Sequence, residues 1–244
     1  GEVAALGRTD PERLASGELV YTGAVRTPLC AIAHTVPFRG RRCRVAAELF
    51  AQAALDDRRY RYIPDDLGYD RDSNGQRWLL GVRFVRPGRL KAEMFAGYMG
   101  QNYEDPRLAD VRKPAFGANV LWQPQAQTVV SLYVDRTIEE TTIFTLSPLT
   151  SASSYVNTYV GLGVDHRLAE RWGVYASASL AFVDYQGIDR RDRYPSAVLG
   201  VSFTVTRHLI LNASFSERRL SSSDPREGFT KRQYFLSAIV PIVP

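Results

Sequence analysis

The sequence predicts an all-β fold, an antiparallel up-and-down transmembrane β-barrel of about 10–12 strands. Three observations favour this class. Segments of roughly ten residues alternate apolar and polar side chains with a period of two. Short turns and longer polar loops separate these segments in turn, as short periplasmic turns and longer extracellular loops do in membrane barrels. Aromatic residues such as Trp122, Trp172 and Tyr185 lie near the segment ends, where membrane barrels carry aromatic girdles.

The barrel is expected to occupy residues 44–244, and ten strands can be assigned there. They span residues 44–55, 76–85, 90–101, 115–122, 128–136, 155–166, 173–182, 197–205, 209–216 and 233–243. Tight turns are expected at residues 86–89, 123–125, 168–171 and 206–208, and longer loops at 102–113, 187–192 and 224–226. Residues 20–27 could form one more strand, and a partner strand for it would give twelve. Residues 1–43 are expected to form a periplasmic extension, a plug or the first strands.

The two faces of the expected strands differ in chemistry. Between residues 197 and 205, Leu199, Val201 and Phe203 share one face, and Ser202 and Thr204 share the other. The apolar face is expected to contact lipid, and the polar face to line the lumen. The expected lumen-lining residues are Arg44, Glu48, Gln52, Arg83, Lys91, Glu93, Asn119, Ser131, Tyr133, Asp135, Asn157, Tyr159, Asp165, Asn212 and Arg218.

The charged residues of the expected lumen have two interpretations. They could form ion pairs that fill a narrow barrel, or a polar lining that conducts or binds a hydrophilic solute. A barrel of about ten to twelve strands has limited internal room, because small barrels are filled by their own side chains. Filling is therefore favoured for a closed monomer.

A soluble β-sandwich would also alternate with a period of two, since its outer faces are wet. The strands here continue past the apolar band as charged ends, at residues 56–61, 136–140 and 217–219. Together with the aromatic girdles, these long strands favour the membrane barrel over the sandwich.

Charge, hydropathy and cysteine content limit the partners and the compartment. The formal net charge is +5, but Lys and Arg are interleaved with Asp and Glu, so no nucleic-acid partner is expected. No apolar run reaches the ~18 residues that a membrane helix needs. The two cysteines, Cys30 and Cys43, could form a disulfide, which suits an oxidising compartment such as the periplasm, or could be two free buried thiols.

Nine segments, in this order, are similar to a known family. They are Tyr-Arg-Tyr at 60–62, Tyr-Asp-Arg-Asp-Ser-Asn-Gly at 69–75, Gly-Tyr-Met-Gly-Gln-Asn-Tyr at 97–103, Val-Leu-Trp-Gln-Pro at 120–124, Val-Asp-Arg-Thr-Ile-Glu-Glu-Thr at 134–141, Val-Asp-His-Arg-Leu at 164–168, Asp-Tyr-Gln-Gly at 184–187, Arg-Arg-Asp at 190–192 and Arg-Arg-Leu-Ser-Ser-Ser at 218–223. The chain resembles the outer-membrane β-barrel porins of proteobacteria, which are often encoded with polysaccharide-export machinery. The resemblance runs from about residue 60 to the C-terminus and leaves the N-terminal quarter unmatched.

No catalytic, metal or cofactor site is expected. The three histidines, His34, His166 and His208, form no cluster with one another or with cysteine. No Gly-x-Ser-x-Gly elbow and no phosphate-binding glycine-rich loop is present. A barrel enzyme acting on lipid is a less favoured hypothesis, in which His166 would act with Asn157 or Ser154.

The leading hypothesis is a porin-like protein of the bacterial outer membrane that passes or exports a hydrophilic solute such as polysaccharide. This step rests on the resemblance. The alternative is a structural barrel that anchors a larger envelope complex, with the N-terminal segment contacting a partner or plugging the lumen. The expected partners are membrane lipid and lipopolysaccharide, together with envelope or export-complex proteins.

Overall fold

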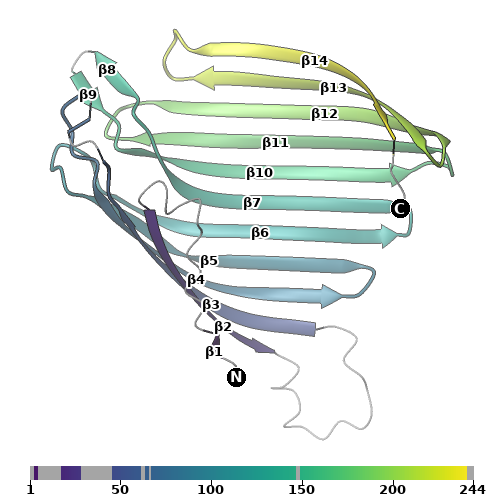
Figure 1. Cartoon of the computed structure of the whole chain (residues 1–244), viewed down its shortest axis with the longest axis horizontal. Coiled ribbons are helices and arrows are strands. Elements are labelled where there is room, and N and C mark those ends of the chain that lie inside the picture. Colours follow the sequence, from purple (N-terminus) through teal and green to yellow (C-terminus); the bar gives the residue numbers. More distant parts are fainter. Residues whose placement is uncertain are drawn as a thin grey trace, which may run out of the picture.

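Twelve antiparallel strands form one large sheet in the computed structural model, which describes residues 3–4, 18–28, 46–61, 64–65, 67–146 and 149–240. The strands are β1 (Val3–Ala4), β2 (Glu18–Pro28), β3 (Ala46–Arg58), β4 (Ser73–Arg86), β5 (Leu90–Tyr103), β6 (Val111–Gln125), β7 (Thr128–Glu140), β10 (Ser154–Arg167), β11 (Trp172–Gln186), β12 (Arg191–Thr206), β13 (Leu209–Ser222) and β14 (Gly228–Ile239). Within the sheet they follow chain order, while β8 (Phe144–Leu146) and β9 (Leu149–Ser151) form a separate hairpin (Figure 1). No helix in the described ranges is long and apolar enough to cross a membrane.

The ten strands expected from residue 44 onward are present as β3 to β7 and β10 to β14. The additional expected strand is present as β2, and β1 pairs with it to give twelve. Most strands extend further than expected toward the long loops, so the loops expected at 102–113 and 187–192 shorten to 104–110 and 187–190. The apolar pattern ends earlier than the strand, because the backbone ladder needs N–H and C=O groups but no apolar side chains.

Short and long connections alternate along the sheet. One end, the turn end, carries connections at residues 87–89, 126–127, 168–171 and 207–208. The opposite end, the loop end, carries connections at residues 59–72, 104–110, 141–153, 187–190 and 223–227. In the turn between β4 and β5, Gly88 has a φ of 68°, a left-handed conformation that favours glycine.

The turn expected at residues 123–125 is wrong. These residues belong to β6, and the chain reverses at residues 126–127 instead. The pairing of β6 with β7 shifts register between Trp122 and Gln125. Pro124 has no N–H to donate to the ladder, so it is accommodated in this irregularity within the strand.

One face of the large sheet, the apolar face, is exposed over most of the strands. Leu80, Leu199 and Leu236 expose 70%, 58% and 87% of their surface there. The pairing register places all three tryptophans of the chain, at positions 78, 122 and 172, on this same face. An exposed apolar surface that runs across so many strands is typical of proteins that bury it against another phase or partner.

Aromatic rings on the opposite, polar face pack over glycines of the neighbouring strand. Phe50 is paired in register with Gly81, and Tyr175 with Gly200. A Cβ atom at either glycine would collide with the paired ring. The glycines therefore make room for bulky rings to lie against the sheet.

The sheet divides into two layers at the loop end. β6 pairs with β7 only from Gly117 toward the turn end, whereas the first part of β6 pairs with β5 and the last part of β7 pairs with β10. Ile138 and Val156, on β7 and β10, pack there against Leu79 and Met99 from the polar face of β4 and β5. The end of β7 therefore lies over the polar face of the preceding strands.

The large sheet is open in this structure. β14 forms one edge and the short β1, paired with β2, forms the other (Figure 1). Among the described residues, no backbone pairing joins β14 to β1 or β2. The expected antiparallel up-and-down order is confirmed. In the described part of the chain, the first and last strands of the sheet do not pair to close it into a barrel.

Replacing Gly81 with alanine should destabilise the sheet. The added methyl group would meet the Phe50 ring and, at 2.7 Å, the backbone carbonyl oxygen of Met94, which cannot move without disturbing the ladder. We expect the free energy of unfolding to fall by about 1–3 kcal/mol, measured by urea titration in detergent. Gly228→Ala is the control, because its nearest contact would be 3.6 Å away. Equal losses in the two variants would contradict this packing.

Candidate functional site

A row of polar side chains crosses the polar face from strand to strand. Residues paired in register place their side chains on the same face of a sheet. In register order the row is Glu48, Arg83, Glu93, Asn119, Tyr133, Gly161, Ser179, Ser196, Arg218 and Lys231. It extends from β3 to β14 and contains no aliphatic side chain.

The residues expected to line a lumen share this face wherever the structure describes them. Register and alternation place there Glu48, Gln52, Arg83, Lys91, Glu93, Asn119, Ser131, Tyr133, Asp135, Asn157, Tyr159, Asp165, Asn212 and Arg218. Arg44 lies outside the described residues, as do both members of the expected disulfide, Cys30 and Cys43.

Opposite charges on the polar face are paired locally. Arg83 forms an ion pair with Glu93 and lies 3.7 Å from Glu48. Nearer the loop end, Arg77 Nη2 is 3.4 Å from Asp135 Oδ1. Partly exposed pairs of this kind contribute little to stability. They give the face both signs of charge, so the surface is hydrophilic without a strong bias toward anions or cations.

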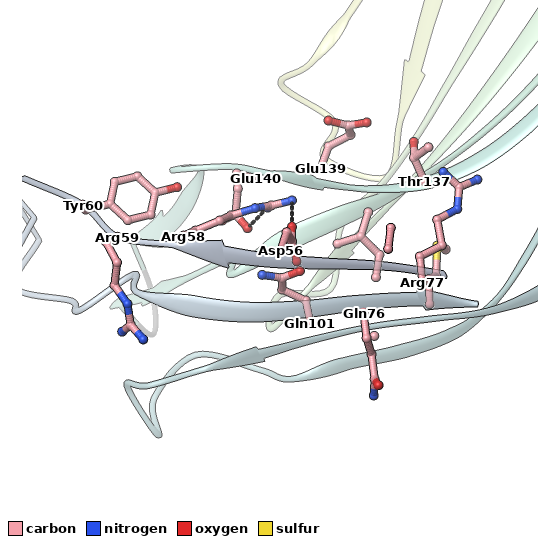
Figure 2. Close-up of a pocket in the computed structure, with 14 residues that line it drawn as sticks. Asp56, Arg58, Arg59, Tyr60, Gln76, Arg77, Gln101, Thr137, Glu139 and Glu140 are labelled. Carbon is pink, nitrogen blue, oxygen red and sulfur yellow. Dashed lines mark hydrogen bonds and ion pairs between the residues drawn. The ribbon is translucent and has the colours of Figure 1, made fainter. Parts of the chain in front are cut away.

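A cavity of about 520 Å³ opens where the end of β7 lies over β3, β4 and β5. Figure 2 shows that charged and polar side chains surround it. The guanidinium of Arg58 is 2.7 Å from Asp56 and 2.5 Å from Glu140 of β7. The Tyr103 hydroxyl donates a hydrogen bond of 2.9 Å to the same Glu140 oxygen. These contacts tie the end of β7 to β3 and β5 and fix the separation of the two layers.

The charges around the cavity balance. The lining has three acids and three arginines. The acids are Asp56, Glu139 and Glu140, and the arginines are Arg58, Arg59 and Arg77. The amide of Gln101 adds an uncharged donor and acceptor. Two buried atoms of this lining, Glu140 Oε2 and Arg77 Nε, have no hydrogen-bond partner among the described residues. Such atoms favour an occupant that can form hydrogen bonds.

A buried arginine joins two of the long connections at the loop end. Arg71, in the connection between β3 and β4, is 4% exposed. Its guanidinium donates to Asp65 Oδ2 at 2.6 Å, to Ser151 Oγ at 2.6 Å and to the carbonyl oxygen of Thr141 at 2.7 Å. Ser151 and Thr141 lie between β7 and β10, so hydrogen bonds to a charged group hold two connections together.

Two aspartates extend this loop network. Asp105, between β5 and β6, accepts hydrogen bonds from the Arg107 side chain at 2.6 Å and from the backbone N–H of Asp70 at 3.1 Å. The Arg107 guanidinium holds the pKa of Asp105 well below its usual range, against the opposing effect of burial. Burial raises the pKa of Asp65, but hydrogen bonds from backbone N–H groups and from Arg71 outweigh it and lower that pKa.

Sequence reasoning missed the residues of the cavity and of the loop network. Arg58 and Glu140 belong to charged strand ends, and Arg71 and Asp105 to loops, so the period-two pattern assigns them no partner. One signal was present, because the segments at 69–75 and 134–141, which carry the family resemblance, contain Arg71 and Glu140. The family resemblance therefore included these residues but gave no information about their contacts.

The groups named in the catalytic hypothesis lie far apart. His166 lies at the turn end of β10 on the apolar face, where its Nδ1 is 2.8 Å from Thr128 Oγ1. Asn157 and Ser154 lie near the loop end of the same strand, about 30 Å or more away at the rise of a strand. No group of His, Cys, Asp and Glu side chains within the described ranges could hold a metal ion.

The family model described as "Putative beta-barrel porin 2" matches residues 41–240. The chain belongs to this β-barrel porin family. No curated protein matches it. The match covers every strand from β3 to β14, so the resemblance found in the sequence is confirmed at the level of the porin family. The association with polysaccharide export stays a prediction.

Acid should release the loop network of this porin-family protein. Because the pKa of Asp105 is lowered in the folded state, its contribution to stability is fully present above its unfolded pKa, near pH ~4, and is lost as the pH falls through the folded-state value. Asp65 acts in the same direction. We expect the backbone amides of residues 104–110 to lose protection against hydrogen exchange, corrected for intrinsic rates, between about pH 5 and about pH 2.

In the variant Asp105→Asn, the amides of residues 104–110 should already have, at about pH 5, the low protection against hydrogen exchange that the unmodified protein reaches only in acid. Asp189→Asn is the matched control, because Asp189 is an exposed loop aspartate. Protection of residues 104–110 that persists unchanged to about pH 2 would contradict the proposed role of the Asp105 carboxylate.

Proposed function

We propose that this porin-family protein is an outer-membrane β-barrel that passes a hydrophilic solute, such as a polysaccharide, across the bacterial outer membrane. The observation that carries the proposal is the separation of the two faces. The polar row runs across the sheet from Glu48 to Lys231, while Leu80, Leu199 and Leu236 are exposed on the opposite face. Hydrocarbon covers the apolar face, and the polar face lines the solute path.

The cavity at the loop end is the narrow part of this path. Its lining offers donors from Arg77 and Gln101 and acceptors from Glu140, and its acids and arginines balance. A path lined in this way suits a solute with many hydroxyl groups and little net charge. The ion pairs on the polar face support the same reading, because they cancel the field that would otherwise select ions of one sign.

A structural barrel that anchors a larger envelope complex is the second candidate. Arg58 and Tyr103 hold Glu140 over the polar face, so the end of β7 partly fills the space that a solute would use. A filled barrel would need no open path. We propose no enzymatic role, since the groups named for catalysis lie at opposite ends of β10.

Purified protein in planar lipid bilayers should produce stable steps of ion conductance. Removing single charges from the polar row should then shift the ion selectivity in opposite directions. Arg83→Gln should move the reversal potential toward cation selectivity, and Glu93→Gln should move it toward anion selectivity, because each leaves its partner's charge uncompensated in the path.

Glu170→Gln, in an exposed turn, is the control and should leave the selectivity close to that of the unmodified protein. Opposite shifts in the two variants cannot come from general damage to the fold. Folded protein that conducts no ions would favour the structural anchor, and identical selectivity in all three variants would show that the polar face does not line the path.

A further inference from the structure

Four arginines lie together on the apolar face of the sheet, at its loop end. Arg191 and Arg193 are on β12, Arg219 is on β13 and Arg232 is on β14. Alternation along each strand places them on the same face as the exposed apolar residues, including Leu199 on β12. We call these four residues the arginine patch.

The pairing register sets three of these arginines in a diagonal line. Arg193 is paired with Ser221, two residues beyond Arg219, and Arg219 is paired with Thr230, two residues before Arg232. Diagonal neighbours across strands have Cα atoms roughly 7–8 Å apart, which arginine side chains easily span. Two adjacent guanidinium groups can therefore donate to one anionic group between them.

The patch has an excess of positive charge. Arg191 is 3.3 Å from Asp184, and Arg232 is 2.6 Å from Glu217. Neither Arg219 nor Arg193 forms an ion pair with any described residue, and the Arg193 guanidinium lies over the ring of Phe182, 5.7 Å from its centroid. Four arginines and two acids leave two positive charges, and all four arginine side chains are exposed.

The patch lies at one border of the apolar band. Below Arg193 on β12, the residues from 195 to 205 that share its face are Pro195, Ala197, Leu199, Val201, Phe203 and Val205. At the rise of a strand and the usual tilt, this stretch spans about 25 Å, the height of the apolar band in membrane barrels. Beyond its apolar residues β4 carries the uncharged Asn74 and Gln76 on this face, while β6 and β7 carry one arginine each, Arg112 and Arg136, so the arginines are densest on β12 to β14.

We propose that the arginine patch binds the phosphate groups of a lipid with two phosphates on its headgroup, in the leaflet on the loop side. This inference rests on the proposed membrane location. A guanidinium forms paired, charge-assisted hydrogen bonds to phosphate, and the line from Arg193 to Arg232 provides two such positions. Two uncompensated charges match two phosphates better than the single phosphate of a common phospholipid.

The test uses the full chain, folded in a neutral detergent and mixed with diphosphoryl lipid A, with phosphatidylglycerol or with phosphatidylcholine. Lipid that remains bound after size-exclusion chromatography is measured by mass spectrometry. The double variant Arg193→Gln/Arg219→Gln should retain about tenfold less diphosphoryl lipid A than the unmodified protein, because hydrogen bonds to charged groups are lost. Phosphatidylglycerol should be retained weakly, and phosphatidylcholine not at all.

Arg218→Gln is the matched control, because Arg218 is adjacent to Arg219 but projects from the polar face. It should retain the lipid normally. If the double variant does not fold, the single variants replace it. Arg219→Lys should then retain more diphosphoryl lipid A than Arg219→Gln does, because lysine keeps the positive charge. Equal retention by the unmodified protein and the variants, or equal retention of phosphatidylglycerol, would overturn the proposal. Conductance is measured on the same samples. Ion conductance without selective lipid retention would refute lipid binding by the patch alone, whereas lipid retention without conductance would refute the proposed pore alone.

Discussion

The backbone ladder that joins β2 to β14 is the constraint on which the rest of the structure depends. It fixes which residues lie opposite one another and therefore which side chains share a face. A slip of one residue in β12 would move Leu199 and Phe203 to the polar face and Ser202 to the apolar face. The ladder also pairs the backbone groups of interior strands, which is the condition for a sheet to cross hydrocarbon.

The distribution of charge follows from this separation. Over most of the apolar band, charged side chains lie on the polar face, where Arg83 lies between two acids; the ion pair of Glu217 with Arg232, beside Ala197, is on the apolar face. At the loop end, charges occur on both faces and in the connections. There Arg58 and Glu140 link the two layers of the sheet, and Arg71 links the long connections. The loop end is thus both the most polar and the most cross-linked part of the described protein.

The strands and their faces could be predicted from the sequence because a period of two is a local property. The run from Leu199 to Val205 reveals its own apolar face without knowledge of its neighbours. Where Pro124 interrupts β6, local reasoning placed a turn, because the sequence does not show that β7 continues the ladder past an irregularity. The contacts between Arg58 and Glu140 join residues far apart in the chain and depend on the division between β6 and β7, which has no local signal.

The three tryptophans provide the most direct test of the claim that hydrocarbon covers the apolar face. Trp78, Trp122 and Trp172 all lie on that face and are 49%, 49% and 47% exposed. The measurement is the quenching of their fluorescence in vesicles, by phospholipids with brominated acyl chains and by acrylamide in the water. The account predicts strong quenching by the brominated lipids and little by acrylamide. The reverse result would mean that water, or another protein surface, meets this face instead.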